Sequence, residues 1–85
     1  MSEWTFLISM PSRYADFVDL ILDTNEVVFH RFDGLRYSPR GRRYVKWTWF
    51  FVGGPETRKY ILPIVVRELQ SKYHIQVPNE YIEVI

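Results

Sequence analysis

Cysteine is absent from all 85 positions of the chain, which excludes disulfide bonds, thiol catalysis and cysteine-based zinc sites. Long apolar runs are also missing, and no run reaches the roughly 18 residues that a membrane-spanning helix needs. The first residues, Met1-Ser2-Glu3-Trp4, lack the basic and apolar regions of a signal peptide. We therefore expect a cytoplasmic protein that does not contact a membrane.

Apolar surface, by contrast, is plentiful. Hydrophobic residues make up 47% of the chain, and fifteen residues are Phe, Trp or Tyr. This is enough for one small hydrophobic core, so residues 1–85 are expected to fold as a single domain. Domains of this size lie near the lower limit of independent stability, and association is one way to bury more surface. We therefore expect a homodimer.

The first third of the chain predicts a strand followed by a helix. Trp4 to Met10 is rich in strand-forming residues, and Pro11 ends the run. Ser12 is suited to cap the helix, and Asn25 to end it in the left-handed conformation. The inner face has apolar residues at helical spacing: Tyr14, Phe17, Val18 and Ile21. The outer face carries three carboxylates: Asp16, Asp19 and Asp23.

Residues 26–52 predict one long β-hairpin with a Ser38-Pro39-Arg40-Gly41 turn. Asp33-Gly34 is a second turn or bulge signal, so the pairing register stays open. From Arg31 to Lys46 there are six cations and one acid, a local charge of +5. The rest of the chain has five cations and nine acids, a charge of −4. A near-neutral chain therefore carries a basic hairpin on a mildly acidic body.

The last third predicts a second helix and a closing strand. Apolar residues at helical spacing follow Gly53-Gly54-Pro55: Ile61, Ile64, Val65, Leu69 and Tyr73. Pro63 lacks an amide donor, so the helix either bends there or begins its regular part near Leu62. Residues 80–85 predict a strand. The resulting order, β-α-β-β-α-β, predicts an α+β, ferredoxin-like domain in which two helices cover one face of a four-stranded antiparallel sheet.

Alternation in the second strand of the hairpin predicts which side the helices cover. One set is uniformly apolar: Val45, Trp47, Trp49 and Phe51. The other set is mixed: Tyr44, Lys46, Thr48, Phe50 and Val52. The apolar set is expected to face the helices, because a one-sided sheet buries its more apolar face. In the first strand we expect Trp4, Phe6 and Ile8 to face the helices. In the first arm of the hairpin we expect Val28, His30 and Phe32 inward, and Phe29 and Arg31 on the open face.

The predicted binding site joins this open face to the basic hairpin, residues 31–46. Bases stack on exposed rings for roughly 1–3 kcal/mol each, and phosphates are attracted to Arg and Lys. We therefore predict a non-enzymatic module that binds RNA, single-stranded DNA or the acidic surface of a nucleic-acid-handling protein. Its expected binding residues are Arg31, Arg36, Arg40, Arg42, Arg43, Tyr44, Lys46, Phe29 and Phe50.

In element order, and in the rings and cations of residues 42–49 (Arg-Arg-Tyr-Val-Lys-Trp-Thr-Trp), the chain resembles RNA-recognition-motif domains. That family's alternation of glycine and aromatic residues is missing here, and Lys46 stands where a second stacking ring is expected. The resemblance implies an open sheet face that binds single-stranded RNA.

Two other functions stay open. Exposed rings also mark protein contacts, and arginine binds carboxylates, which fits an interaction or inhibitor protein such as a small phage or mobile-element product that docks on a host protein. The third function is a small-ligand or isomerase-like module in a dimeric α+β barrel. Residues 64–69 and 77–84 resemble the helix-to-strand passage of the tautomerase superfamily, whose base is a proline directly after the initiator methionine. Ser2 stands at that position, so the tautomerase activity is not implied.

Candidate catalytic groups are isolated in the sequence. His30 and His74 have no carboxylate, serine or second histidine at a recognisable spacing. The histidines and carboxylates show no metal-ligand spacing either. We therefore expect a protein without enzymatic activity, metal or cofactor.

Overall fold

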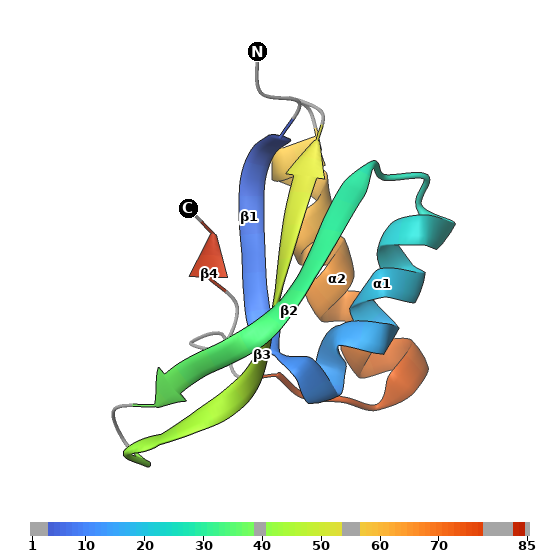
Figure 1. Cartoon of the computed structure of the whole chain (residues 1–85). Coiled ribbons are helices and arrows are strands. Elements are labelled where there is room, and N and C mark those ends of the chain that lie inside the picture. Colours follow the sequence, from blue (N-terminus) through green and yellow to red (C-terminus); the bar gives the residue numbers. More distant parts are fainter. Residues whose placement is uncertain (1–3, 39–40, 54–56, 78–82, 85) are drawn as a thin grey trace.

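The protein is α+β, with an antiparallel sheet and two helices. The computed structural model describes residues 4–38, 41–53, 57–77 and 83–84. In chain order the elements are β1 (Trp4–Pro11), the short 3-10 helix η1 (Ser12–Tyr14), α1 (Ala15–Thr24), β2 (Phe29–Ser38), β3 (Arg43–Gly53), α2 (Thr57–Tyr73) and β4 (Glu83–Val84). Both α-helices lie on the same side of the sheet (Figure 1). The α+β class predicted from the sequence is therefore confirmed.

The sheet has the strand order β2-β3-β1-β4, and each neighbouring pair is antiparallel. Three long strands form most of it. β4 adds only two residues, which pair with Ile8 and Ser9 at the edge of β1. The rest of the predicted closing strand, residues 80–82 and 85, lies outside the described residues.

The hydrophobic core fills the space between the sheet and the helices. Its central side chains are fully buried, and burying one such apolar side chain contributes roughly 1.5–3 kcal/mol. The strands contribute Phe6, Ile8, Met10, Phe50 and Val52. The helices contribute Ala15, Val18, Ile21, Leu22, Ile61, Val65 and Leu69. The predicted inward positions Phe6 and Ile8 of β1 are thus confirmed, whereas the side chain of Trp4 lies outside the described set.

The N-terminal end of α1 is held by a side-chain contact that differs from the predicted cap. Neither η1 nor α1 has a side-chain cap at its first turn. The hydroxyl of Ser12 instead lies 2.8 Å from the Thr48 hydroxyl on β3. Ser12 therefore fixes the helix to the sheet and does not cap it.

Phe17 of α1, predicted to face inward, is exposed, and the centre of its ring lies 5.1 Å from that of the Tyr73 ring.

The C-terminal end of α1 also differs from the prediction by one residue. Asn25 has φ −89°, and its side-chain amide donates a hydrogen bond to the carbonyl of Ile21. The left-handed conformation belongs to Glu26, with φ 57°. A side chain with a Cβ is strained in that conformation.

β2 and β3 pair without interruption from Phe29, opposite Val52, to Ser38, opposite Arg43. The bulge signal at Asp33-Gly34 therefore does not shift the register. Both strands continue together beyond the two helices, toward the lower left of Figure 1. We call residues 35–38 and 41–46 the arm. Pro39 and Arg40, in the predicted turn, lie outside the described residues.

α2 runs without a break from Thr57 to Tyr73, with Pro63 inside it. Pro63 is exposed, while the buried positions Ile61, Val65 and Leu69 are four residues apart and face the sheet. In the described part of the chain, no helix has the length and hydrophobicity that crossing a membrane requires. Pro55, the predicted first helical residue, lies outside that part.

Candidate functional site

The two faces of β3 are the reverse of those predicted from the sequence. Phe50 and Val52 have no exposed surface and belong to the core under the helices. Trp49 and Phe51, predicted to face the helices, are half-buried and lie on the opposite side of the strand. The prediction that Trp47, Trp49 and their neighbours face the helices is therefore wrong.

The reversal has a physical cause in the length of β3. Tyr44 and Lys46, the polar members of the mixed set, lie on the arm beyond the helices and are exposed. Only Thr48, Phe50 and Val52 of that set lie under the helices, and Thr48 is buried with its hydroxyl hydrogen-bonded to Asp33 and Ser12. Thr48, Phe50 and Val52 can therefore be buried under the helices without leaving a polar side chain unsatisfied.

The same register reverses the predicted faces of β2. Phe29 and Arg31 stand opposite Val52 and Phe50, so they lie on the helix side. The rings of Phe29 and Phe50 are 5.8 Å apart. His30 and Phe32, predicted to face the helices, therefore lie on the open face.

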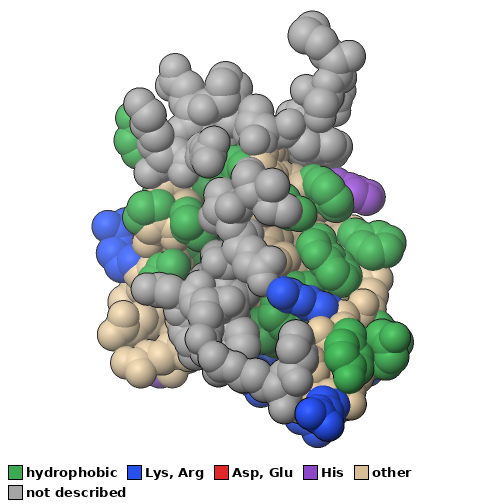
Figure 2. Space-filling view, turned by 90° about the vertical axis from the view of Figure 1, so that its left-hand side faces the viewer, with side chains coloured by type: hydrophobic (Ala, Val, Ile, Leu, Met, Phe, Trp, Pro, Cys, Tyr) green, Lys and Arg blue, Asp and Glu red, His purple; other side chains and the backbone are tan. Residues whose placement is uncertain are grey.

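Aromatic rings form a row across the open face of the sheet. Phe32 stands opposite Trp49, with ring centroids 5.7 Å apart, and His30 stands opposite Phe51, at 6.4 Å. Phe32 is 55% exposed. From β1, Leu7 and Ser9 lie beside Phe51 and Trp49 on the same face. Figure 2 looks at the molecule from this side and shows hydrophobic side chains gathered along one part of it.

Gly34 makes room for this row. A Cβ at position 34 would lie 3.1 Å from the outer edge of the Trp49 ring and 3.4 Å from the Phe32 ring. The contact with Trp49 is closer than side chains normally allow, so a larger residue would require that ring to shift by a few tenths of an ångström. The glycine that suggested a bulge in the sequence therefore has a packing role.

The open face continues onto the arm through Arg36. Its guanidinium lies over the Trp47 ring, 4.5 Å from the ring centre. Arg36 stands opposite Val45, and Ser38 opposite Arg43, so both arginines share the face of Phe32 and Trp49. Arg36 and Arg43 of the arm thus continue directly from the aromatic row.

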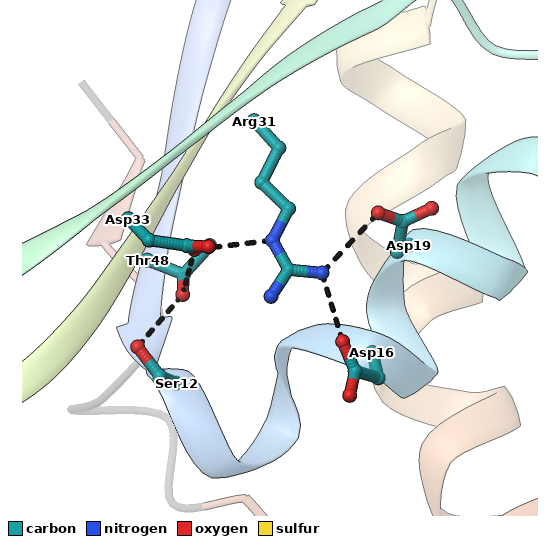
Figure 3. A network of polar contacts seen from close by, with 6 residues as sticks. All are labelled: Ser12, Asp16, Asp19, Arg31, Asp33 and Thr48. Atoms are coloured by element: carbon teal, nitrogen blue, oxygen red, sulfur yellow. Dashed lines mark hydrogen bonds and ion pairs between the residues drawn. The ribbon is translucent and has the colours of Figure 1, made fainter.

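Arg31 connects the hairpin to α1 on the opposite side of the sheet (Figure 3). Its Nε donates to the Asp33 carboxylate at 3.0 Å, and its Nη1 donates to Asp16 at 2.9 Å and Asp19 at 3.3 Å. Asp33 also accepts a hydrogen bond from Thr48 at 2.7 Å. Because the one hydroxyl proton of Thr48 goes to Asp33, Ser12 donates to Thr48. These six residues form the Arg31 network.

The Arg31 network shifts the pKa of both of its central charged groups, Arg31 and Asp33. Burial by itself lowers the pKa of Arg31, but hydrogen bonds with Asp16, Asp33 and Asp19 outweigh it and raise the pKa above its usual value. The hydrogen bond from Thr48, followed by that from Arg31, lowers the pKa of Asp33. Both groups are therefore held in the charged form near neutral pH.

The structure brings together only part of the predicted set of binding residues. Arg36, Arg42, Arg43, Tyr44 and Lys46 lie on the arm, where all but the half-buried Arg36 are exposed. Phe50 is completely buried, Phe29 packs against the core, and Arg31 is engaged with three carboxylates. These last three residues are not available on the open face. Arg40 lies outside the described residues.

Sequence reasoning missed the residues that do line the open face, namely His30, Phe32, Trp49 and Phe51. One signal could have found them. Arg31 and Asp33 are two apart on one side of a strand and follow a helix that presents Asp16 and Asp19. Arg31 can form ion pairs with the carboxylates of that helix, which places Arg31 and Asp33 on the helix side of the strand. Alternation along the strand then places Phe32 on the opposite face.

The chemistry available at the open face is stacking, cation contact and hydrogen bonding. In the described part of the chain, His, Asp and Glu side chains form no group of three that could hold a metal ion. Comparison with protein-family models, curated proteins and solved structures finds no match to the chain.

Proposed function

We propose that the chain is a ferredoxin-like, non-enzymatic module of the cytoplasm that binds single-stranded nucleic acid across its open sheet face and functions as a homodimer. The β-α-β-β-α-β order and the strand order β2-β3-β1-β4 support the ferredoxin-like assignment. The open face, together with Arg36 and Arg43 of the arm, would form the binding surface, which departs from the predicted set by using Phe32 and Trp49 in place of Phe29 and Phe50.

The pair of Phe32 and Trp49 is the observation that supports binding most directly. Phe32 is 55% exposed, and together with the Trp49 ring beside it forms an apolar patch, which marks a binding site more often than a single exposed ring does. Each ring offers a flat surface on which one base can stack, and stacking contributes about 1–3 kcal/mol per base. Phe32 and the half-buried Trp49, with ring centroids 5.7 Å apart, would together offer stacking surface for up to two bases.

The distribution of charge around these rings favours a polyanion. Arg36 and Arg43 lie on the same face as the rings. Asp33, the one acid of residues 31–46, is held on the other face by Arg31 and Thr48. No Asp or Glu side chain of the described residues is visible in the view onto the open face (Figure 2). Phosphates on this face would therefore meet cations.

Single strands fit this surface better than duplexes. The rings lie on a sheet and need bases that are unstacked and turned outward, which single strands provide at low cost. A duplex would offer only its phosphates and would use the arm alone. Single-stranded oligonucleotides should therefore bind more tightly than a duplex of the same length.

Fluorescence anisotropy with a labelled single-stranded oligonucleotide of mixed sequence tests the proposal. Replacing Phe32 by Ala should weaken binding roughly 5- to 150-fold, which corresponds to the loss of one stacked base. Tyr60→Ala is the matched control, because Tyr60 is also an exposed ring but belongs to α2, on the other side of the sheet from the open face. Equal effects of the two substitutions, or equal affinity for a duplex, would contradict the proposal.

The salt dependence of the same titration tests the role of the arm. Each phosphate contact on a single strand contributes about 0.7 to the slope of log affinity against log salt. Replacing Arg43 by Gln should therefore reduce that slope by about 0.7. A slope near zero for the unmodified protein would show that phosphates are not bound.

Contact with another protein is the second candidate, because exposed ring pairs also occur at protein interfaces. In that case the open faces of two copies would pack together. Phe32→Ala would then dissociate this dimer. Neither the unmodified protein nor the variant would bind the oligonucleotide. The two candidates therefore give opposite results with one variant.

A further inference from the structure

The arm exposes a second apolar surface on the side opposite the open face. Leu35, Tyr37 and Tyr44 are 64%, 50% and 69% exposed. Tyr37 and Tyr44 stand opposite each other with their rings 5.4 Å apart, in an edge-to-face arrangement. Lys46 stands opposite Leu35 and is also exposed. We call these four residues the inner face of the arm.

The inner face of the arm is separate from the proposed nucleic-acid surface. Leu35 and Tyr37 share the strand face of Arg31, which points toward the helices, whereas Phe32 and Arg36 point to the open side. The helices end before the arm, so they leave this part of the strand face uncovered (Figure 1). The exposed rings of Tyr37 and Tyr44 are therefore not explained by stacking of bases on Phe32 and Trp49.

α1 carries a surface of matching character. Leu20 is 50% exposed at the middle of the helix. Asp16 and Asp23, both exposed, lie four residues before it and three residues after it, so they flank it on the same side of the helix. Phe17, also exposed, lies three residues before it. The helix thus presents an apolar centre bordered on one side by Asp23 and on the other by Asp16, which also pairs with Arg31 of its own chain.

We propose that the inner face of the arm packs on α1 of a second copy of this chain, and that two such contacts, related by two-fold symmetry, form the homodimer. Both surfaces are apolar at the centre, and their charges are opposite. Two inner faces would not pack on each other as well, because Lys46 and the neighbouring arginines of both copies would be brought together.

The arm cannot make this contact within its own chain. α1 packs beside α2 over the sheet, whereas the arm extends away from both helices (Figure 1). Two-fold symmetry allows each arm to reach the helix of the other copy, so both contacts form at once. The proposal rests on the homodimer stated above and is independent of nucleic-acid binding.

A charge exchange between the two surfaces tests the proposal by sedimentation velocity at low salt. Lys46→Glu should raise the dimer dissociation constant at least about tenfold, because it places Glu opposite carboxylates in both contacts. Asp23→Lys should do the same by placing Lys opposite Lys46. An equimolar mixture should form the dimer again, since in the mixed dimer each contact joins opposite charges.

Two further variants separate this interface from the alternatives. Tyr44→Ser should dissociate the dimer and Phe32→Ala should leave it intact, because only Tyr44 lies on the inner face. The proposal is overturned if the unmodified protein is a monomer, if the mixture of the two charge variants stays monomeric, or if Phe32→Ala dissociates the dimer. If the unmodified protein is a monomer that still binds the oligonucleotide, the dimer interface is contradicted and the proposed nucleic-acid binding is not.

Discussion

Thr48 is the residue whose partners explain the arrangement of β3. By hydrophobicity alone it is a poorer core residue than Trp49, and this ranking led to the wrong face. Its hydroxyl, however, donates to Asp33 and lies 2.8 Å from that of Ser12, so its burial leaves no polar group unsatisfied. Such partners come from distant parts of the chain, and the local pattern of one strand does not contain them.

Neighbouring phenylalanines on β3 give a direct check of this arrangement. Phe50→Ala should lower the free energy of unfolding by about 3–5 kcal/mol, because the ring is fully buried. Phe51→Ala should cost far less, since its ring is half-buried on the open face. Urea denaturation followed by circular dichroism measures both. A larger loss for Phe51 than for Phe50 would restore the face assignment predicted from the sequence.

Glu26 offers a second check on a single residue. Its φ of 57° is unfavourable for a side chain with a Cβ. Glu26→Gly should therefore raise the free energy of unfolding by about 0.5–1 kcal/mol, whereas Glu26→Ala, which keeps the Cβ, should not. Thermal unfolding of the two variants provides the comparison, and equal stabilities would show that backbone strain at this position is negligible.

Side-chain ion pairs join β2 to α1. The carboxylates Asp16 and Asp19 were interpreted from the sequence as part of a solvated helix face, yet both bind Arg31. The helix and the antiparallel hairpin both followed from residue patterns. The contact between them did not, because pairing of charges across elements depends on register, and the register was open.

Replacing Arg31 by Lys tests how this contact is made. The guanidinium binds Asp33 through Nε and the two helix carboxylates through Nη1, and a single ammonium group cannot reproduce both directions. We expect a loss of about 1 kcal/mol in the free energy of unfolding. Arg67→Lys, at an exposed position on α2, is the control and should change little. A similar loss for both would argue against the network.

Acid titration of stability tests the charge state of Asp33. Its pKa in the folded protein is lower than usual, so its contribution to stability is complete above the pKa of the unfolded chain and is lost as pH falls through the folded value. Asp33→Asn should therefore flatten the decrease in stability on the acid side. Glu26→Gln, at an exposed carboxylate outside the Arg31 network and outside the proposed dimer interface, is the reference. An unchanged acid profile in Asp33→Asn would contradict the lowered pKa.

The molecule has a hairpin longer than its helices, and this difference in length leaves the inner face of the arm uncovered, while the open face lies on the side of the sheet that has no helices. The sequence predicted the hairpin and its charge, but hydrophobic alternation was applied to β3 as if one environment extended along all of it. Tyr44 and Lys46 belong to the uncovered arm, and Phe50 belongs to the core. One strand therefore passes through two environments, and only the three-dimensional arrangement shows where the change occurs.

Side-chain nuclear magnetic resonance spectra, recorded while a single-stranded oligonucleotide is added, test the central proposal most directly. We predict large shifts in the ring signals of Phe32 and Trp49 and in the methyl signals of Leu7, all on the open face. Signals of Leu20 on α1 and of buried Ile8 should stay nearly unchanged. Shifts concentrated on α1, or absent from Phe32 and Trp49, would contradict binding at this face.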